Sequence, residues 1–329
     1  MKIRGLTIKS TVGAAVLAVF TALGLTSTAA AAYPERTIRV VVPYNAGGGT
    51  DILARAIANA AGEILKQPVI VDNRAGASGM IGSEYVGKSA PDGYTFLMTA
   101  ADTHSVNPHV YPNIRYDAVK DFRPVVQIGY LPYALVVSPK LNVNTLKEFI
   151  DLAKKQPGKL TFASWGVGST SQVAMEMFKI KTGTDLLHVP FTGAAPAMNG
   201  VISGQTDAMF VPLSLAVPNA QGGKVKILGL GAPKRFADAA NIPTLAEQGV
   251  DLDTSPWIGI LAPSKVSPEV IKTFYSAVEK AAKQPKVQQA LTTGGLEIQV
   301  LDPDQFGKVL ARDYQRWGET VRQAGVKAQ

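Results

Sequence analysis

The fold is decided by residues 38–51, which read Ile38-Arg39-Val40-Val41-Val42-Pro43-Tyr44-Asn45-Ala46-Gly47-Gly48-Gly49-Thr50-Asp51. The short β-branched run at its start is typical of a buried parallel strand. Directly after the glycines, apolar residues recur at helical spacing, namely Ile52, Leu53, Ala56, Ile57, Ala60, Ile64 and Leu65. The stretch therefore predicts a strand, a glycine loop and a helix in succession.

The glycine loop is a candidate anion site. Three consecutive glycines let the backbone approach a ligand closely, and Thr50 or Asp51 is placed to cap the helix, whose free amides favour negative charge. The loop lacks the Gly-Lys-Ser/Thr of a nucleotide-binding P-loop, and Ile52 stands where the dinucleotide fingerprint requires its third glycine. We therefore expect an anion other than a nucleotide. A plain glycine turn, with Asp51 acting only as a cap, remains the alternative.

Residues 1–32 have the pattern of a signal peptide. Lys2, Arg4 and Lys9 form a basic start, residues 12–25 form an apolar core, and Ala30-Ala31-Ala32 offers small residues for cleavage. We expect removal after Ala32 and export of a soluble mature chain. A membrane anchor is the alternative, but the apolar part is short and interrupted by Thr21 and Gly24.

Composition excludes several classes of protein. The 329 residues contain no cysteine, so neither disulfides nor thiolate metal ligands are expected. The formal net charge is +8, and three of the cationic residues belong to the leader. The remaining charge is dispersed and forms no basic block of the kind that nucleic acid binding usually requires. We therefore expect no nucleic acid partner.

The first half of the mature chain alternates strands with helices. Strands are predicted at residues 68–71 and 94–98, with a helix at 81–88 between them, which favours a parallel, doubly wound sheet. Ligands of such sheets bind beyond the carboxyl ends of the strands. Residues 99–103, including Asp102 and Thr103, lie at such an end, so they could line the same pocket as Tyr44, Asn45, Gly47, Gly48 and Thr50.

A second domain resembles the opening unit. A strand at 160–164 precedes the loop 165–168 and a helix started by residues 169–171, and a strand at 188–191 precedes the turn Thr192-Gly193 and another helix. Helix starts from the two domains could face one cleft, with Ser169, Thr170 and Thr192 opposite the first glycine loop. Trp165 offers an apolar wall or is simply packed. Asp207 could accept a hydrogen bond from the ligand, although we favour a role in holding the Thr192 loop.

The chain is expected to cross between these domains twice. Residues 33–137 and 256–329 form the first, discontinuous domain, and residues 138–255 form the second. The crossings near Ser138 and residues 254–256 would make a hinge. Helices at 268–283, 285–292 and 303–324 complete the first domain, and the last helix runs back over it.

No catalytic or metal-binding array stands out. His104, His109 and His188 are the three histidines, and none lies in a zinc motif, while Ser169 lacks the flanking glycines of a nucleophile elbow. We expect His188 to be a core or wall residue. The sequence thus predicts no enzyme, no cofactor and no metal, with an exported serine hydrolase assembled from distant residues as the alternative.

Five segments together resemble the Bug, or TctC-like, family of periplasmic solute receptors of tripartite tricarboxylate transporters. They are residues 42–51, 72–77, 116–122 with its Tyr116-Asp117 and Asp121-Phe122 pairs, 163–169 and 191–197. In order, they span nearly the whole mature chain. Two positions depart from the family pattern: Trp165 stands where a small residue is common, and Gln172 where histidine is expected.

The resemblance implies a periplasmic Venus-flytrap receptor with an α/β fold, in which mainly parallel sheets are flanked by helices and joined by a hinge. It implies that the loops at Tyr44 to Thr50, at Ser169-Thr170 and at Thr192 to Ala195, including Ala194, grip a carboxylated solute. The expected ligand is a dicarboxylate or an aromatic carboxylate, and the expected partners are the membrane permease subunits of such a transporter. We expect a monomer. A ligand-sensing subunit for a membrane sensor would use the same clamp.

Overall fold

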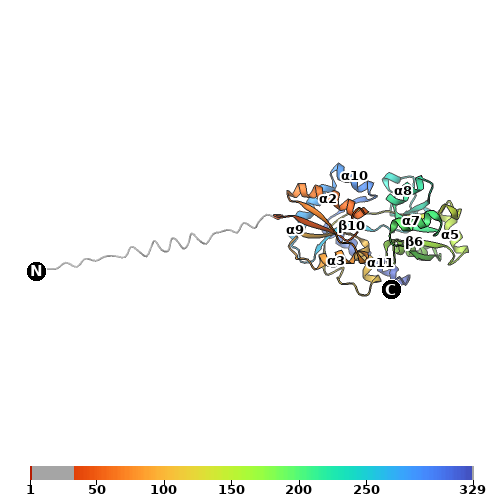
Figure 1. Cartoon of the computed structure of the whole chain (residues 1–329), viewed down its shortest axis with the longest axis horizontal. Coiled ribbons are helices and arrows are strands. Elements are labelled where there is room, and N and C mark those ends of the chain that lie inside the picture. The colour runs from red at the N-terminus through yellow and green to blue at the C-terminus, as the bar shows by residue number, and fades with distance from the viewer. Residues whose placement is uncertain (2–32, 328–329) are drawn as a thin grey trace. The chain divides into compact units, whose positions relative to one another are not determined.

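Figure 1 shows the computed structural model, which describes residue 1 and residues 33–327. The expected signal peptide and its cleavage site lie, apart from Met1, outside the described residues. Contacts divide the chain into Met1–Glu35 and a second unit that begins at Arg36. Both sheets lie in the second unit. None of the helices in the described part combines the length and the apolar character that crossing a membrane requires.

The first sheet has six strands in the order β11-β4-β10-β3-β1-β2. Their bounds are β1 Ile38–Val42, β2 Val69–Asn73, β3 Thr95–Ala100, β4 Phe122–Tyr130, β10 Trp257–Pro263 and β11 Glu297–Leu301. β1 pairs in parallel with β2 and β3, so that Val40 lies opposite Val71 on one side and Phe96 on the other. Four of its five residues are buried, as the β-branched run predicts for a strand covered on both faces.

The second sheet has five strands in the order β7-β6-β8-β5-β9. Their bounds are β5 Tyr133–Val137, β6 Thr161–Ser164, β7 Leu187–Pro190, β8 Ala208–Pro212 and β9 Lys226–Gly231. β6 pairs in parallel with β7 and β8. The loops that follow β6 and β7 therefore leave the same edge of this sheet.

Both sheets are mixed, whereas we expected mainly parallel pairing. β10 runs antiparallel to β3 and β4, and β11 runs antiparallel to β4. In the second sheet β5 is antiparallel to β8 and β9. The parallel pairs are those joined through crossover helices, and the antiparallel pairs involve strands at or beyond the crossings between sheets.

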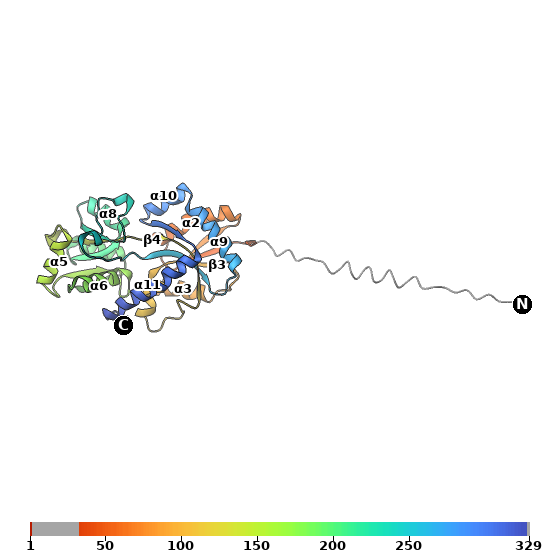
Figure 2. The same cartoon turned by 180° about the vertical axis from the view of Figure 1, so that it is seen from behind.

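Helices cover both faces of the first sheet (Figures 1 and 2). On one side lie α2 Gly49–Leu65, α9 Pro268–Ala282 and α10 Pro285–Thr293, which pack against one another. On the other side lie α3 Met80–Gly87 and α11 Pro303–Gln323. Val86 of α3 and Phe306 of α11 share a core with Val41, Leu97 and Trp257 of the sheet.

The second sheet is covered in the same way. α5 Leu146–Lys155 and α6 Thr170–Thr182 enclose one core, while α7 Ala194–Ser203 and α8 Leu213–Gln221 enclose the other. Thr145 caps α5 by accepting a hydrogen bond from the Glu148 N–H. α8 and β11 are elements that our sequence analysis did not assign.

The chain passes from the first sheet to the second within residues 131–132, between β4 and β5. β5 pairs only within the second sheet, so this crossing is earlier than the boundary at residue 137 that we expected. Between β3 and β4, the chain forms the π-helix Asp102–Val106 and the short helix α4 Asn107–Val110.

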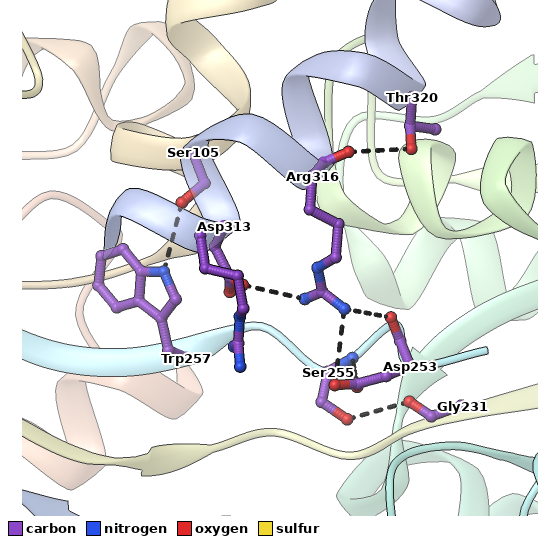
Figure 3. Close-up of polar contacts among 9 residues, drawn as sticks. Ser105, Gly231, Asp253, Ser255, Trp257, Asp313, Arg316 and Thr320 are labelled. Atoms are coloured by element: carbon purple, nitrogen blue, oxygen red, sulfur yellow. Dashed lines mark hydrogen bonds and ion pairs between the residues drawn. The ribbon is translucent and has the colours of Figure 1, made fainter. Parts of the chain in front are cut away.

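Helix α11 fixes the segment that returns to the first sheet (Figure 3). An Nη1–H group of Arg316 donates to the backbone oxygen of Asp253 at 2.7 Å, and Arg316 also forms ion pairs with the carboxylates of Asp253 at 3.5 Å and Asp313 at 3.4 Å. The Ser255 hydroxyl donates to the Gly231 carbonyl at 3.0 Å. α11 thereby holds the returning segment at Asp253, and Ser255 joins that segment to the end of β9.

Candidate functional site

The N-terminus of α2 follows the first glycine loop and is not capped by any side chain. Its N-cap is Gly48, so the predicted cap at Thr50 or Asp51 was wrong. The Asp51 carboxylate instead accepts the Gly47 N–H at 2.8 Å and pairs with Arg55 at 3.0 Å. The described residues supply no acceptor for the N–H groups of Gly49 and Thr50. These donors remain open at the positive end of a 17-residue helix.

Asp51 stabilises the loop in its ionised form. Its second oxygen accepts from Asn73 Nδ2 at 3.0 Å, and Asn73 also donates to the Tyr44 carbonyl at 3.2 Å. Burial alone would raise the pKa of Asp51, but the hydrogen bonds from Arg55, Gly47 and Asn73 outweigh it and lower the pKa. The ionised Asp51 carboxylate and its hydrogen-bond partners therefore fix the conformation of the glycine loop.

A line of hydroxyl groups connects Tyr44 to the end of β3. The Tyr44 hydroxyl lies 3.3 Å from Thr99 Oγ1, which lies 2.8 Å from Thr103 Oγ1. Thr99 and Thr103 are fully buried, whereas Asn45 is exposed. Burial, followed by the charge of Asp102, raises the pKa of Tyr44, so this phenol stays neutral. Thr103 is therefore linked to Tyr44 through Thr99 and is not accessible to solvent.

The N-terminus of α6, in contrast, is filled by side chains of the protein. Ser169 is the N-cap and accepts from the Gln172 N–H at 3.3 Å, while Gln172 Oε1 accepts from the Gly168 N–H at 2.7 Å. The Thr170 N–H donates to Asp102 Oδ1 at 3.1 Å, and the Thr170 hydroxyl contacts Tyr133 at 2.8 Å. Both hydroxyls that we expected to face the ligand already have partners.

The N-terminus of α7 is open, like that of α2. Its N-cap is Gly193, whose φ of 148° places it in a region that glycine tolerates best, and no side chain caps it. Thr192 and Ala195 are exposed and Ala194 is half-buried. No described acceptor reaches the N–H groups of Ala194 and Ala195. Of the three helix starts that the sequence predicted for the site, those of α2 and α7 thus keep free donors and that of α6 does not.

Two other predicted residues have mainly structural surroundings. Trp165 is half-buried, packs against both cores of the second sheet and meets the Tyr133 ring edge to face at 5.6 Å. Asp207 precedes β8 and accepts from Thr161 N at 2.8 Å and Thr161 Oγ1 at 2.9 Å. It lies at the opposite end of the sheet from the Thr192 turn. The expectation that it holds that turn was wrong, because β6 and β8 are parallel and their starts are neighbours.

The predicted residues therefore fall into three groups, with Asp207 outside all of them. Tyr44, Asn45, Gly47, Gly48 and Thr50 lie at the α2 end, and Thr192, Ala194 and Ala195 lie at the α7 end. Ser169, Thr170, Trp165 and Thr103 support the connections between them, and Asp207 lies apart. The loops after β3 and β6 meet directly through the Asp102–Thr170 hydrogen bond and through Tyr111, whose hydroxyl donates to the Val167 carbonyl at 3.2 Å.

Two cavities that are lined partly by α11 lie away from these loops. An apolar one of about 310 Å³ lies beneath α11 and includes His104, Phe122 and Leu310 in its wall. A polar one of about 480 Å³ lies beside the returning segment and includes Gln127, Asp253 and Arg312. Their linings contain none of the predicted ligand-binding residues, so cavity size alone would point elsewhere than the glycine loops do.

Comparison with known proteins identifies the family. Residues 53–326 match the family model described as "Tripartite tricarboxylate transporter family receptor". The chain belongs to this receptor family.

Solved members of similar fold extend this result. The structure of Rpa4515 from Rhodopseudomonas palustris with adipate is 30% identical, covers 90% of this chain and 100% of its own, and has a TM-score of 0.81. The periplasmic binding protein BugD is 30% identical with a TM-score of 0.77 over 90% of this chain and 100% of its own. MatC from the same R. palustris, with bound malate, is 30% identical with a TM-score of 0.75 over 88% and 100%.

The two-domain α/β architecture is that of the periplasmic binding proteins, as the sequence resemblance implied. The receptor family and its Bug relatives are likewise as predicted. Sequence reasoning missed Tyr133, whereas Asp102 was among residues 99–103 that we expected to line the pocket. Asp102 carried a usable signal, since it follows the carboxyl end of a predicted strand.

Proposed function

We propose that this receptor captures a small organic carboxylate, either a dicarboxylate or an aromatic carboxylate, in the periplasm and delivers it to a tripartite tricarboxylate-type permease. The observation that carries the proposal is the pair of uncapped helix ends, α2 in the first sheet and α7 in the second. Each end favours an anion by about 0.3 to 1 kcal/mol, and by more when partly buried. Two such ends suit a ligand with two anionic groups.

The family supports this ligand class. Two solved relatives, one with adipate and one with malate, hold dicarboxylates of different length. We assign one carboxylate to the backbone N–H groups at Gly49 and Thr50, beside Tyr44, and the other to those at Ala194 and Ala195, beside Thr192. Trp165 would border the carbon chain with its exposed edge. Ser169 and Thr170 position the loops, and Asp207 is not part of the site.

Closure about a hinge would bring the two helix ends together. The strand connection at residues 131–132 and the segment around Asp253 to Ser255 are the two crossings, and α11 holds the second through Arg316. We propose two domains. The first consists of residues 33–137 together with 256–329, and the second consists of residues 138–255, except that β5 is assigned to the second domain. The signal peptide at residues 1–32 would direct the chain to the periplasm, where a monomer would meet its permease.

Ser164 and His188 lie within hydrogen-bond distance of each other, but their surroundings do not support hydrolysis. Ser164 Oγ lies 2.7 Å from His188 Nε2, but Ser164 is fully buried and also bonds to the Gly166 N–H and carbonyl. Burial, followed by the charge of Lys179, lowers the pKa of His188 to about 4. A buried serine with these partners cannot reach an ester, so we propose a receptor without catalytic activity.

The test is a thermal-shift screen of the purified protein against mono-, di- and tricarboxylates, aromatic acids and amino acids. A ligand that binds only the folded state adds about 2.7 kcal/mol of stability at 100 times its dissociation constant. We expect stabilisation by one class of carboxylate and no turnover of carboxylic esters. If no acid stabilises the protein, or if esters are hydrolysed at the same site, the proposal is wrong.

A further inference from the structure

The apolar cavity beside α11 has no part in the carboxylate site. Its volume of about 310 Å³ lies in the range of small-molecule pockets. α11 lines one wall with Gly307 and Ala311, which are one turn apart, and their small side chains leave room between the helix and the segment that leads into β4. Ala311 and Val119 of the lining are exposed, so the cavity can be entered from solvent.

The wall of this cavity contains a buried imidazole with an unsatisfied nitrogen. His104 is only 3% exposed, and its Nδ1 lies 2.8 Å from Thr103 Oγ1. Its Nε2, on the other side of the ring from Thr103, has no hydrogen-bond partner among residues 33–327. Buried polar atoms without a partner are rare in folded proteins, because each one costs its full desolvation free energy.

The hydrogen bonds around Thr103 indicate which kind of partner Nε2 lacks. The Thr103 hydroxyl has one proton, which it donates to the Ala100 carbonyl at 3.3 Å. Toward His104 it therefore acts as an acceptor, so that Nδ1 carries the ring proton. Burial lowers the pKa of His104 to about 3, so the ring is neutral at pH 7 and has only this proton. Nε2 is an acceptor in need of a donor.

We propose that this cavity is a second binding site, for an apolar molecule of one or two rings whose single N–H or O–H group donates to His104 Nε2. The rings would pack against Leu310 and Phe122 in the wall. Nε2 itself has almost no exposed surface. The Phe122 ring, which meets the imidazole edge to face at 4.4 Å, would have to turn as the donor enters, and such side-chain changes are common on binding.

The test compares two probes of nearly equal size and shape. Indole has one N–H donor, whereas benzofuran has an ether oxygen in its place and no donor. Titration calorimetry of the full-length chain should show indole binding about tenfold more tightly than benzofuran, as expected for one hydrogen bond to a buried acceptor. In ¹⁵N spectra of histidine-labelled protein, Nε2 of His104 should be unprotonated and should shift on addition of indole.

Variants separate this cavity from unspecific apolar binding. Ala311→Leu fills the space with a residue that favours helix, and it should weaken indole binding at least tenfold while leaving carboxylate binding unchanged. Lys308→Leu adds the same side chain at an exposed position of α11 outside the lining and should keep indole binding. His104→Phe keeps a ring and removes the nitrogen, so the ratio of the two affinities should approach one.

Four results would overturn the inference. They are absence of indole binding, equal affinities of the wild-type protein for indole and benzofuran, a protonated Nε2 in His104, and indole binding that Ala311→Leu leaves unchanged. The first three need no variant to observe. None of them bears on the proposed receptor function, because the cavity lining shares no residue with the open ends of α2 and α7.

Discussion

Replacing Gly49 by proline would test the α2 end by removing a single backbone donor. Gly49 is the first residue of α2, the position where proline is most readily accepted in a helix. The preceding residue, Gly48, has φ −74° and ψ 165°, which is the extended conformation that a residue before proline prefers. A Cβ atom added at Gly49 meets nothing within 4 Å. The substitution therefore deletes the N–H and leaves the helix intact.

Its two effects should have opposite signs. Replacing glycine by proline at a compatible position stabilises a protein by about 0.4 to 1 kcal/mol, because the unfolded chain loses freedom. Loss of one hydrogen bond to a charged carboxylate costs about 1.5 to 3 kcal/mol, which weakens binding about ten- to a hundredfold. We expect a slightly higher melting temperature and a clearly weaker complex.

The matched control is Gly49→Ala, which adds a side chain at the same open position but keeps the N–H. Titration calorimetry with the tightest dicarboxylate from the screen, together with urea unfolding, would measure both quantities for the three proteins. Equal affinity of the proline and alanine variants would refute the assignment of a carboxylate to this helix end. A destabilised proline variant would refute our description of the Gly48–Gly49 backbone.

Three further substitutions address the frame of the site. Ser169→Ala removes the cap of α6 and should lower the free energy of unfolding by about 1 kcal/mol; weaker ligand binding at unchanged stability would instead show that Ser169 contacts the ligand. Asp51→Asn should destabilise the protein at pH 7. Because the pKa of Asp51 is lowered in the fold, the difference in free energy of unfolding from wild type should shrink as the pH falls below the ordinary value of 3.8. A difference that does not depend on pH in urea titrations would contradict the role of the ionised Asp51 carboxylate in holding the loop. Arg316→Met should lower the free energy of unfolding by about 2 kcal/mol through lost contacts to Asp253 and Asp313, which is more than an exposed ion pair contributes and less than a buried one. Unfolding curves identical to those of wild type would show that α11 does not hold the returning segment.

Local pattern was enough to predict most elements. The strand at residues 38–42, the helices after each glycine loop and the final helices were predicted within a few residues, since side-chain periodicity and glycine or proline positions are properties of adjacent residues. β11 was missed because Glu297–Leu301 is an edge strand with no buried residue, so it lacks the apolar signal of β1. The antiparallel pairing of β10 could not be predicted from local pattern either, because the direction of pairing depends on where the chain re-enters the first sheet.

The sequence by itself determined the class of this protein, an α/β solute receptor with glycine loops that suit anions. Only the tertiary structure decided which helix ends remain free. α6 carries the same kind of loop as α2, yet its first N–H is taken by Asp102, which is 68 residues away in the chain. Asp207 likewise found Thr161, 46 residues away, rather than the nearby turn. A donor is open or occupied according to which distant side chain folding brings beside it, and a single sequence does not encode that neighbour as a local pattern.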